Sequence, residues 1–199
     1  MDANIKILKE TDFKTTAWSG GDTTQIYIYP ETAQYADQDF LYRISTATVL
    51  SETSRFTRLE NYDRILTVLE GSMELEREKQ LPLIPLKPLK PFLFGGEVPI
   101  ISHGQCKDFN LMFQKSAQGQ VRILPMEEGE AEFVLEPENH YVLYLIKGRS
   151  NVTFGGKECF LCDGEALVLN QIRETGCKLK ITRKEENTLL ALCCIAFNG

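Results

Sequence analysis

Hydrophobic and polar residues alternate with a period of two through most of the chain. The pattern is clear in TTQIYIYP (23–30), FLYRISTATV (40–49) and RILTVLEG (64–71), where β-branched and aromatic residues are frequent. Further segments of the same kind span residues 73–78, 109–115, 131–137, 141–148, 165–170 and 179–184. Glycine, proline, asparagine or aspartate usually separates them, as turns require. Many short strands joined by turns predict an all-β sandwich or barrel.

Helical signals are weak in comparison. No segment keeps a helical stripe for more than about two turns, and the best candidate is TAQYADQDF at 32–40. The segment PLIPLKPLKPFLFGG at 82–96 is rich in proline, which cannot donate a hydrogen bond to a neighbouring strand. We therefore expect extended structure at a sheet edge there.

Two segments, one in each half, are near copies of each other. ILTVLEG at 65–71 and VLYLIKG at 142–148 each end an apolar strand with a charged residue and a glycine. Glycine suits a hairpin position that needs a positive φ, although any two hairpins share part of this pattern. The match predicts two similar β lobes with some shared strands, one over residues 1–125 and the other over 126–199.

Composition and charge narrow the classes of function. The chain has 199 residues, 43% of them hydrophobic, and a formal net charge of −6. An acidic balance argues against nucleic-acid binding, which needs a basic face. The chain has no run of about 18 apolar residues, so we expect no membrane-spanning segment. The first residues, MDANIKILKETDF, lack the apolar stretch of a signal peptide, so we expect a cytoplasmic protein without a membrane partner.

Six cysteines are present, and in a reducing compartment their default state is the free thiol. Cys159 and Cys162 form a Cys-x-x-Cys motif, which is typical of redox-active sites or of half a zinc site. A zinc site needs a second spaced pair, whereas Cys193 and Cys194 are adjacent within an apolar run. We interpret the cysteines as structural thiols.

Five motifs in the first half carry a resemblance to a known family. In chain order they are WSGGDTTQI (18–26), YRISTA (42–47), NYDRIL (61–66), PFLFG (91–95) and KDFNLM (107–112). Their order and spacing closely resemble the HutD/Ves family of small bacterial bicupin proteins, of the RmlC-like cupin superfamily. The resemblance implies a double-stranded β-helix (cupin) barrel in each lobe. It also implies a regulatory, small-molecule-binding protein linked to histidine utilisation or to stress response.

A metal-binding cupin carries His-x-His-x(3,4)-Glu-x(6)-Gly and a later histidine. Anchored on Gly71, this pattern places Arg64 at the glutamate and residues 57–60 at the histidines. Anchored on Gly148, it places Tyr141 at the glutamate. None of these positions is histidine, and the chain contains only His103 and His140. We expect no metal and no cofactor.

Arg64 points instead to an anion. A guanidinium repels a metal ion and grips a carboxylate with two parallel hydrogen bonds. Arg43 and Ser45 alternate on one face of their strand. If that face lines a barrel, Arg43, Ser45 and Arg64 form a polar cluster for a small anionic or polar metabolite. The alternative is a pair of exposed or salt-bridged arginines on the barrel exterior.

A glycine-containing loop adds further candidates. Trp18 precedes Gly20 and Gly21, whose exposed amides can cradle an anion, and Thr23 and Thr24 add hydroxyl groups. The alternative is that Trp18 closes a barrel end and the glycines only turn the chain.

Asn110 lies on the strand face opposite to an aromatic and aliphatic face that we expect to be core, so it faces either the pocket or solvent. Asp108, at the start of the same strand, pairs with an arginine or caps a turn.

We predict no catalytic residue, because neither histidine has a nucleophile partner at motif spacing. The leading hypothesis is a metal-independent binding protein for a small carboxylate or amide, and the resemblance implies urocanate or formylglutamate as ligands. A metal-free isomerase or epimerase, with Tyr62, Tyr141 or His103 as acid or base, is the first alternative. A scaffold for protein interactions is the second, and pairing of sheet edges would make a homodimer.

Overall fold

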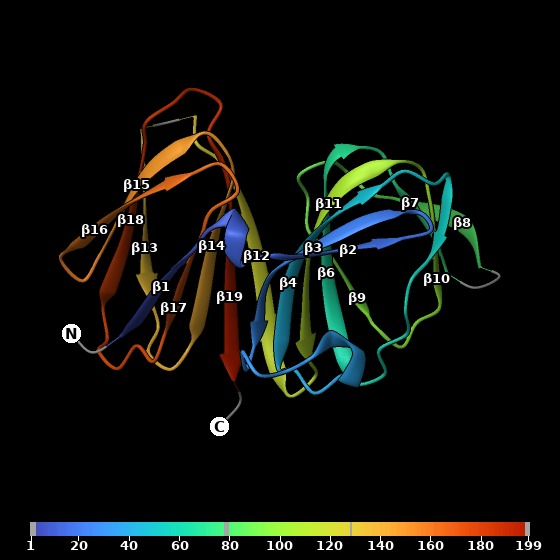
Figure 1. Ribbon diagram of the computed structural model, residues 1–199, viewed down its shortest axis with the longest axis horizontal. Coiled ribbons are helices and arrows are strands. Elements are labelled where there is room, and N and C mark those ends of the chain that lie inside the picture. The colour runs from blue at the N-terminus through green and yellow to red at the C-terminus, as the bar shows by residue number, and fades with distance from the viewer. Residues whose placement is uncertain (1–2, 78–79, 128, 198–199) are drawn as a thin grey trace. The chain divides into compact units, whose positions relative to one another are not determined.

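The computed structural model describes residues 3–77, 80–127 and 129–197, and in this part of the chain strands dominate (Figure 1). The helical elements described there are two short 3-10 turns, η1 (Glu10–Asp12) and η2 (Tyr35–Asp37). The expected helix at 32–40 is thus reduced to η2. No helix in the described ranges is long and apolar enough to cross a membrane. All six cysteines lie in these ranges as free thiols.

The chain divides into two compact units. The first unit comprises residues 13–119, and the second comprises residues 1–12 and 120–199. Residues 1–12, which we expected in the N-terminal lobe, belong to the second unit because β1 (Asn4–Leu8) pairs with β17 (Ala166–Asn170).

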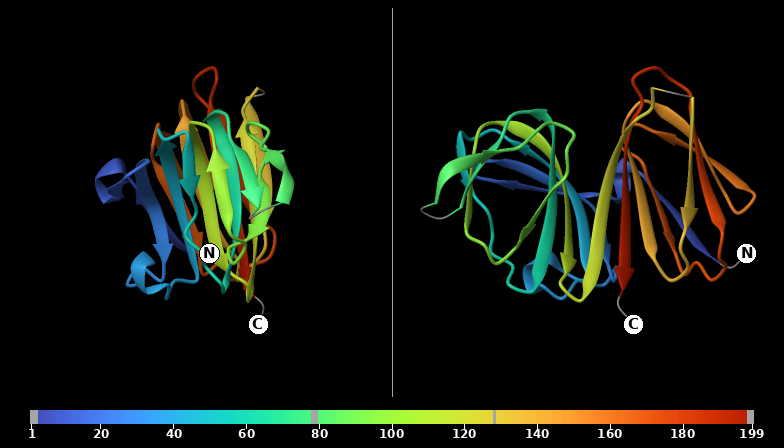
Figure 2. Two further views of the ribbon diagram at one scale, coloured as in Figure 1. Left: turned by 90° about the vertical axis from the view of Figure 1, so that its right-hand side faces the viewer. Right: turned by 180° about the vertical axis from the view of Figure 1, so that it is seen from behind.

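Two antiparallel sheets build the first unit, and Figure 2 shows for each unit two sheets that face each other around a common interior. The strand orders are β2-β3-β4-β11-β6-β9 and β5-β10-β7-β8. The strand bounds are β2 (Lys14–Trp18), β3 (Gly21–Tyr29), β4 (Tyr42–Val49), β5 (Thr53–Arg55), β6 (Tyr62–Gly71), β7 (Glu74–Arg77), β8 (Gln80–Pro85), β9 (Phe92–Gly95), β10 (Ile100–His103) and β11 (Cys106–Gln114).

The second unit repeats this arrangement with strand orders β1-β17-β14-β19-β12 and β13-β18-β15-β16. Its further strands are β12 (Ala117–Pro125), β13 (Glu130–Leu135), β14 (His140–Lys147), β15 (Arg149–Phe154), β16 (Lys157–Cys162), β18 (Cys177–Arg183) and β19 (Leu189–Phe197). The order β17-β14-β19-β12 matches β9-β6-β11-β4, and β13-β18-β15-β16 matches β5-β10-β7-β8. Each unit is therefore a cupin-type double-stranded β-helix, and the predicted fold class is confirmed.

The sequence repeat falls on equivalent strands of the two units. β6 and β14 are inner strands of their sheets. Gly71 and Gly148, which end the two copies, have φ values of 80° and 94°. The positive φ expected at both glycines is confirmed.

The proline-rich segment forms edges, as expected. β8 ends the four-stranded sheet and β9 ends the six-stranded sheet. Two of the strands that the alternation missed have faces that are alike. β19 (LLALCCIAF) is largely buried, whereas every residue of β2 (KTTAW) is exposed, so neither strand alternates in hydropathy.

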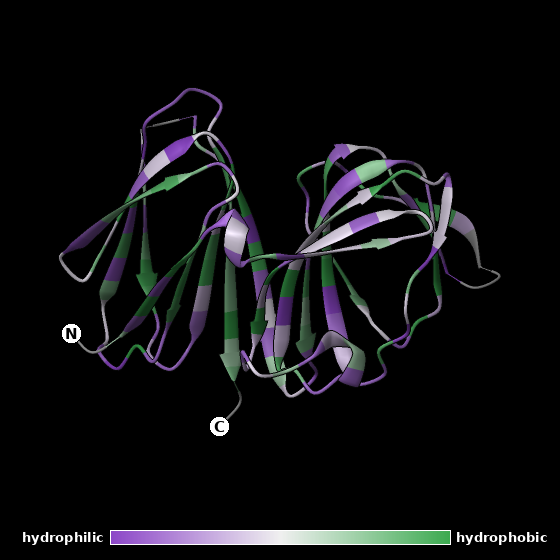
Figure 3. Cartoon of the chain, in the orientation of Figure 1, coloured by the Kyte–Doolittle hydropathy of each residue, from purple (hydrophilic) through white to green (hydrophobic). Residues whose placement is uncertain are grey.

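The interiors of the two units differ. The second unit is filled by one continuous apolar cluster that includes Leu143, Leu145, Leu190 and Leu192. The apolar clusters described in the first unit are smaller, and its inner strands also carry buried arginine, asparagine and aspartate residues. Figure 3 shows polar positions along β4 and β6 next to hydrophobic ones.

Candidate functional site

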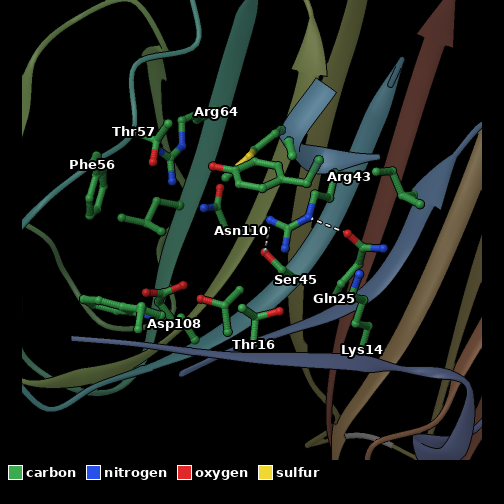
Figure 4. A pocket seen from close by; sticks show the side chains of 18 of the residues that line it. Lys14, Thr16, Gln25, Arg43, Ser45, Phe56, Thr57, Arg64, Asp108 and Asn110 are labelled. Atoms are coloured by element: carbon green, nitrogen blue, oxygen red, sulfur yellow. Dashed lines mark hydrogen bonds between the residues drawn. The ribbon is translucent and has the colours of Figure 1, made fainter. Parts of the chain in front are cut away.

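A cavity of about 650 Å³ lies within the first unit. Its walls come from β2, β3, β4, β5, β6 and β11 and from residues 31–36 and 56–57. Figure 4 shows side chains from several of these strands converging on it. The volume is in the range of small-molecule sites.

Strand alternation decides which side chains enter the cavity. On β4, Arg43 and Ser45 line the cavity, whereas Tyr42 and Ile44 are buried on the opposite face. β4 is therefore buried on both faces, and the buried arginine is on the cavity side. On β11 the cavity side carries Asp108, Asn110 and Met112, and the other side is apolar.

The strand register arranges the cavity-facing residues of the six-stranded sheet in rows. Neighbours within a row lie on adjacent strands. The arginine row is Ile28, Arg43, Met112 and Arg64; the amide row is Gln25, Ser45, Asn110 and Leu66; the acid row is Thr23, Ala47 and Asp108. Successive rows are two residues apart along a strand, or about 7 Å.

A β-bulge keeps β3 in line with these rows. The register shifts between Gln25 and Tyr27, so three residues of β3 span the distance that two residues span on β4. The inserted residue brings both Gln25 and Ile28 onto the cavity face.

Arg43 is held by uncharged partners. Its side chain is buried, with 7% exposed. Nε donates a hydrogen bond to Oε1 of Gln25 at 2.8 Å, and one terminal nitrogen donates to Oγ of Ser45 at 3.4 Å. The guanidinium carbon lies 4.3 Å from the ring centre of Tyr35. These contacts fix the guanidinium without neutralising its charge, and burial lowers its pKa.

The guanidinium of Arg64 lies in a more apolar environment than that of Arg43. Its guanidinium carbon lies 4.6 Å from the ring centre of Phe56 and 5.5 Å from that of Phe94. Burial lowers the pKa of Arg64 to about 10, against the opposing effects of Tyr35 and Asp108. Its Nε is a buried donor with no hydrogen-bond partner among the described residues. An unsatisfied buried donor of this kind costs about 1–3 kcal/mol.

Asn110 lies on β11, the strand between the two arginine-bearing strands (Figure 4). Its Oδ1 is also buried without a hydrogen-bond partner in the described part of the chain. Two residues of the cavity lining therefore carry an orphaned polar atom, and an acceptor for Arg64 together with a donor for Asn110 would satisfy both.

Asp108 is 4% exposed. Burial raises the pKa of its carboxyl to about 7, although the positive charge of Arg64 acts in the other direction. Arg64 therefore compensates the buried carboxylate only in part.

The charges that line the cavity are unbalanced. Positive side chains outnumber negative ones: Lys14, Arg43, Arg55 and Arg64 against Glu31 and Asp108. The chain as a whole has the opposite sign, with a net charge of −6. The cavity is thus a local positive region in an acidic protein.

The structure brings six of the nine expected site residues to the cavity. They are Trp18, Thr23, Arg43, Ser45, Arg64 and Asn110. The exterior alternative for the two arginines does not hold, because both are buried.

Gly20, Gly21 and Thr24 do not line the cavity, contrary to expectation. The carbonyl of Gly20 accepts hydrogen bonds from the amides of Leu50 and Ser51 at 2.8 and 3.1 Å, and a Cβ on Gly20 would overlap the Trp18 ring. The glycines turn the chain beside Trp18 rather than present amides to a ligand. The Thr24 hydroxyl is hydrogen-bonded to the hydroxyl of Thr15 at 2.8 Å.

Further cavity residues were not identified from the sequence as site residues. They include Lys14, Thr16, Gln25, Tyr35, Phe56 and Asp108. Lys14 and Thr16 lie on the same strand face as Trp18, and Asp108 lies on the same face as Asn110. The period of two could therefore have identified these three residues from the sequence. Tyr35 and Phe56 lie outside the strands, and no local pattern indicates their position.

The titratable groups considered for catalysis are not among the residues that line the cavity. His103 is paired with Glu76 at 2.8 Å between Nε2 and Oε2. Tyr62 donates its hydroxyl hydrogen bond to the backbone carbonyls of Gln38 and Phe40, each at 2.7 Å. His140 and Tyr141 belong to the second unit.

The residues of the cavity do not fit a metal ion. Within the described ranges no group of three or more histidine, cysteine, aspartate or glutamate residues is placed to hold one. The cavity lining contains buried guanidinium groups, which repel a cation.

The second unit shows that the fold itself does not require these polar residues. β6 and β11 pair in the same register as β14 and β19. By this register Arg64 corresponds to Tyr141, Asn110 to Leu192 and Asp108 to Leu190. The three residues of the second unit belong to its apolar core. One cupin barrel therefore has apolar residues at these positions, while its counterpart has polar residues that line a cavity.

Asp108 makes the stability of the first unit depend on pH. Because its folded-state pKa is about 7 and the unfolded value is about 4, the folded state retains a proton that the unfolded chain loses between these values. Stability contributed by the protonated carboxyl is present below pH 4 and is lost as the pH rises through 7. Asp108→Asn should remove this loss of stability. Above pH 7 the free energy of unfolding of the variant should exceed that of the wild type by at most about 4 kcal/mol.

Urea denaturation at pH 4, 5, 6, 7 and 8, followed by fluorescence of the single tryptophan Trp18, measures this effect. The difference between variant and wild type should grow from pH 4 to pH 7 and then level off. A difference that does not change with pH would contradict the assignment.

Comparison with known proteins identifies the family. The model of a family described as HutD matches residues 10–190. An uncharacterised 21.2 kDa protein from the hutC 3′ region of Pseudomonas putida is 30% identical over 115 residues, which cover 56% of this chain and 59% of the relative. Protein Ves from Escherichia fergusonii is 34% identical over 109 residues, which cover 52% and 54%. The chain thus spans little more than half the length of either relative.

Solved structures match over nearly the whole chain. A conserved protein of unknown function from Pseudomonas aeruginosa PAO1 has a TM-score of 0.83 and 22% identity, covering 98% of this chain and 100% of that one. HutD from Pseudomonas fluorescens SBW25 has a TM-score of 0.76 and 21% identity with the same coverage. At these identities the structures show the fold alone. Because the family model spans both units, the chain belongs to the HutD family.

Proposed function

We propose that this chain is a metal-independent binding protein for a small carboxylate or amide metabolite, which it holds in the cavity of the first unit. The observation that carries the proposal is the pair of buried arginines, Arg43 and Arg64, whose hydrogen-bonding capacity and charge are not used up by the described residues. A carboxylate supplies the missing negative charge and the acceptor that Nε of Arg64 lacks. The NH₂ group of an amide would serve the orphaned Oδ1 of Asn110.

The energetics favour an anion of modest size. Charge-assisted hydrogen bonds are roughly twice as strong as neutral ones, and the low dielectric of a buried site strengthens them further. The rings of Tyr35 and Phe56, which lie over the two guanidinium groups, hold these groups in place before a ligand arrives. Such preorganisation reduces the entropy lost on binding.

The comparison between the units supports a function rather than a packing role for the polar residues. Buried charges reduce stability unless a partner compensates them, and the second unit forms the same barrel with apolar residues at the corresponding positions. A loss of stability that the fold does not require is expected at a functional site.

The names of the relatives suggest a biological process in which the protein acts. The Pseudomonas putida protein is named for its place in the hutC 3′ region, and the solved HutD structure from Pseudomonas fluorescens refers to a formate condition. We extend this to a regulatory role in histidine utilisation or stress response, with urocanate or formylglutamate as ligands. The free thiols suit a reducing compartment, which supports a cytoplasmic location.

The other hypotheses have less support. The isomerase or epimerase hypothesis needs Tyr62, Tyr141 or His103 at the cavity, and none of the three lines it. A scaffold without a ligand would suit a filled interior, whereas the first unit has an open one.

Isothermal titration calorimetry tests the proposal with urocanate, N-formylglutamate and hexanoate, and with methyl hexanoate as the control without a charge. We expect at least one acid to bind with a dissociation constant of about 1 mM or lower and the ester not to bind. If none of the acids binds, or if the ester binds as tightly as its acid, the proposal is wrong.

A further inference from the structure

We propose that Asp108 recognises the second end of the ligand, so that the cavity selects a carboxylate carrying a hydrogen-bond donor about 7 Å from it. The ligand class is thus an acid with an amine, an amide N–H or a ring N–H as a second functional group, in preference to a plain acid or a dicarboxylate that has no such donor. This inference rests on the proposed function and deepens it.

The first step is where the carboxylate of the ligand lies. Arg43 starts in the arginine row, but its guanidinium reaches Oγ of Ser45 in the amide row. The orphaned Oδ1 of Asn110 belongs to the same row. The donors available to a bound carboxylate, the Arg43 guanidinium and the Ser45 hydroxyl, therefore meet near the amide row. The Asn110 oxygen is an acceptor and stays free for a donor group of the ligand.

The second step is the distance to Asp108. The acid row follows the amide row by two residues on β11, which corresponds to about 7 Å along the strand. In Figure 4 the Asp108 carboxyl lies apart from both labelled arginine side chains. A ligand whose carboxylate sits at the arginines therefore reaches Asp108 only with a second functional group.

The third step is the chemistry of that group. Among the described residues none donates a hydrogen bond to the Asp108 carboxyl, and the charged group acting on it is Arg64. A carboxylate bound to Arg64 weakens this compensation, so Asp108 then needs a donor or a cation from the ligand itself. A second ligand carboxylate would instead place like charges together.

The corresponding position of the second unit is Leu190, a member of the apolar core. The barrel therefore does not need an acid at this point. Thr23 shares the acid row, and its hydroxyl adds an uncharged acceptor beside the proposed donor-binding position.

Three probes with the same six-carbon chain separate the possibilities: 6-aminohexanoate, hexanoate and hexanedioate. Dissociation constants are measured by calorimetry at pH 7.5 for the wild type and for Asp108→Asn. The control is Glu31→Gln, which removes the other carboxylate of the cavity lining. β-Alanine, with the same end groups on a shorter chain, tests the spacing.

We expect the wild type to bind 6-aminohexanoate at least about 10-fold more tightly than hexanoate, as one charge-assisted hydrogen bond allows. Hexanedioate and β-alanine should not bind more tightly than hexanoate. Asp108→Asn should abolish the preference while retaining hexanoate binding, and Glu31→Gln should keep the preference.

Equal affinity of the wild type for 6-aminohexanoate and hexanoate would overturn the inference and leave the proposed function standing. A preference that survives in Asp108→Asn would also overturn it. If no probe binds, the inference fails, and the proposed function fails with it when urocanate and N-formylglutamate also do not bind. The comparison of probes on the wild type remains decisive even if the variant does not fold.

Discussion

Replacing Arg64 by methionine should abolish carboxylate binding and at the same time make the first unit more stable. Arg64 is 5% exposed and its Nε lacks a partner among the described residues, so the folded state carries the cost of a desolvated cation. Replacement of buried charged groups by apolar ones of similar size stabilises by about 1–4 kcal/mol in favourable cases. The loss of two charge-assisted hydrogen bonds should weaken binding at least about 100-fold.

The measurement combines urea denaturation at pH 6 with a calorimetric titration with hexanoate. At pH 6 Asp108 is mostly protonated, because its pKa is about 7, and so it is not left as an unpaired charge. Arg55, an exposed arginine of the same lining, supplies the control: Arg55→Met should change stability by less than about 0.5 kcal/mol. A less stable Arg64→Met protein that still binds hexanoate would contradict the role assigned to Arg64.

Converting the cavity to the pattern of the second unit should have a still larger effect on stability. The triple variant carries Arg64→Tyr, Asp108→Leu and Asn110→Leu, the residues found at the register-equivalent positions. It removes buried charge and adds apolar surface to an interior with an open cavity of about 650 Å³. We expect a gain of about 3–6 kcal/mol in unfolding free energy and complete loss of carboxylate binding.

Trp18 lies in the first unit and is the single tryptophan, so its fluorescence reports the unfolding of that unit. The reverse exchange, Tyr141→Arg with Leu190→Asp and Leu192→Asn, is the matched control. It buries charge in a filled core and should unfold the second unit, as circular dichroism would detect. A triple variant of the first unit that loses stability would show that its polar residues serve the fold.

The sequence predicted many of the strands from the alternation of their residues and from their β-branched and aromatic residues. ILTVLEG and VLYLIKG were identified as equivalent strands because they match over seven positions and each ends in a charged residue and a glycine, and both glycines have positive φ in the structure. The alternation also placed Arg43 and Ser45 on one face. It did not determine which face lies inside, because that depends on how the second sheet packs against the first in three dimensions.

Other parts of the site were beyond local patterns. The bulge in β3 breaks the period of two at Ile26, so alternation alone does not place both Gln25 and Ile28 on the cavity face. Tyr35 and Phe56 reach the arginines from segments outside the strands. The two glycines at 20 and 21 looked like an anion cradle because the sequence does not show the close approach of the Trp18 ring.

The most direct test of anion binding by the two buried arginines is an NMR titration that follows the Nε–H signals of arginine side chains. Hexanoate is added to the wild type, and Arg43→Lys and Arg64→Met assign the two signals. The expected result is that the Nε–H signals of Arg43 and Arg64 shift together and saturate, whereas those of exposed arginines outside the cavity lining, such as Arg58 and Arg149, stay in place. Shifts confined to the exposed arginines, or no shift at saturating hexanoate, would contradict carboxylate recognition by the buried pair.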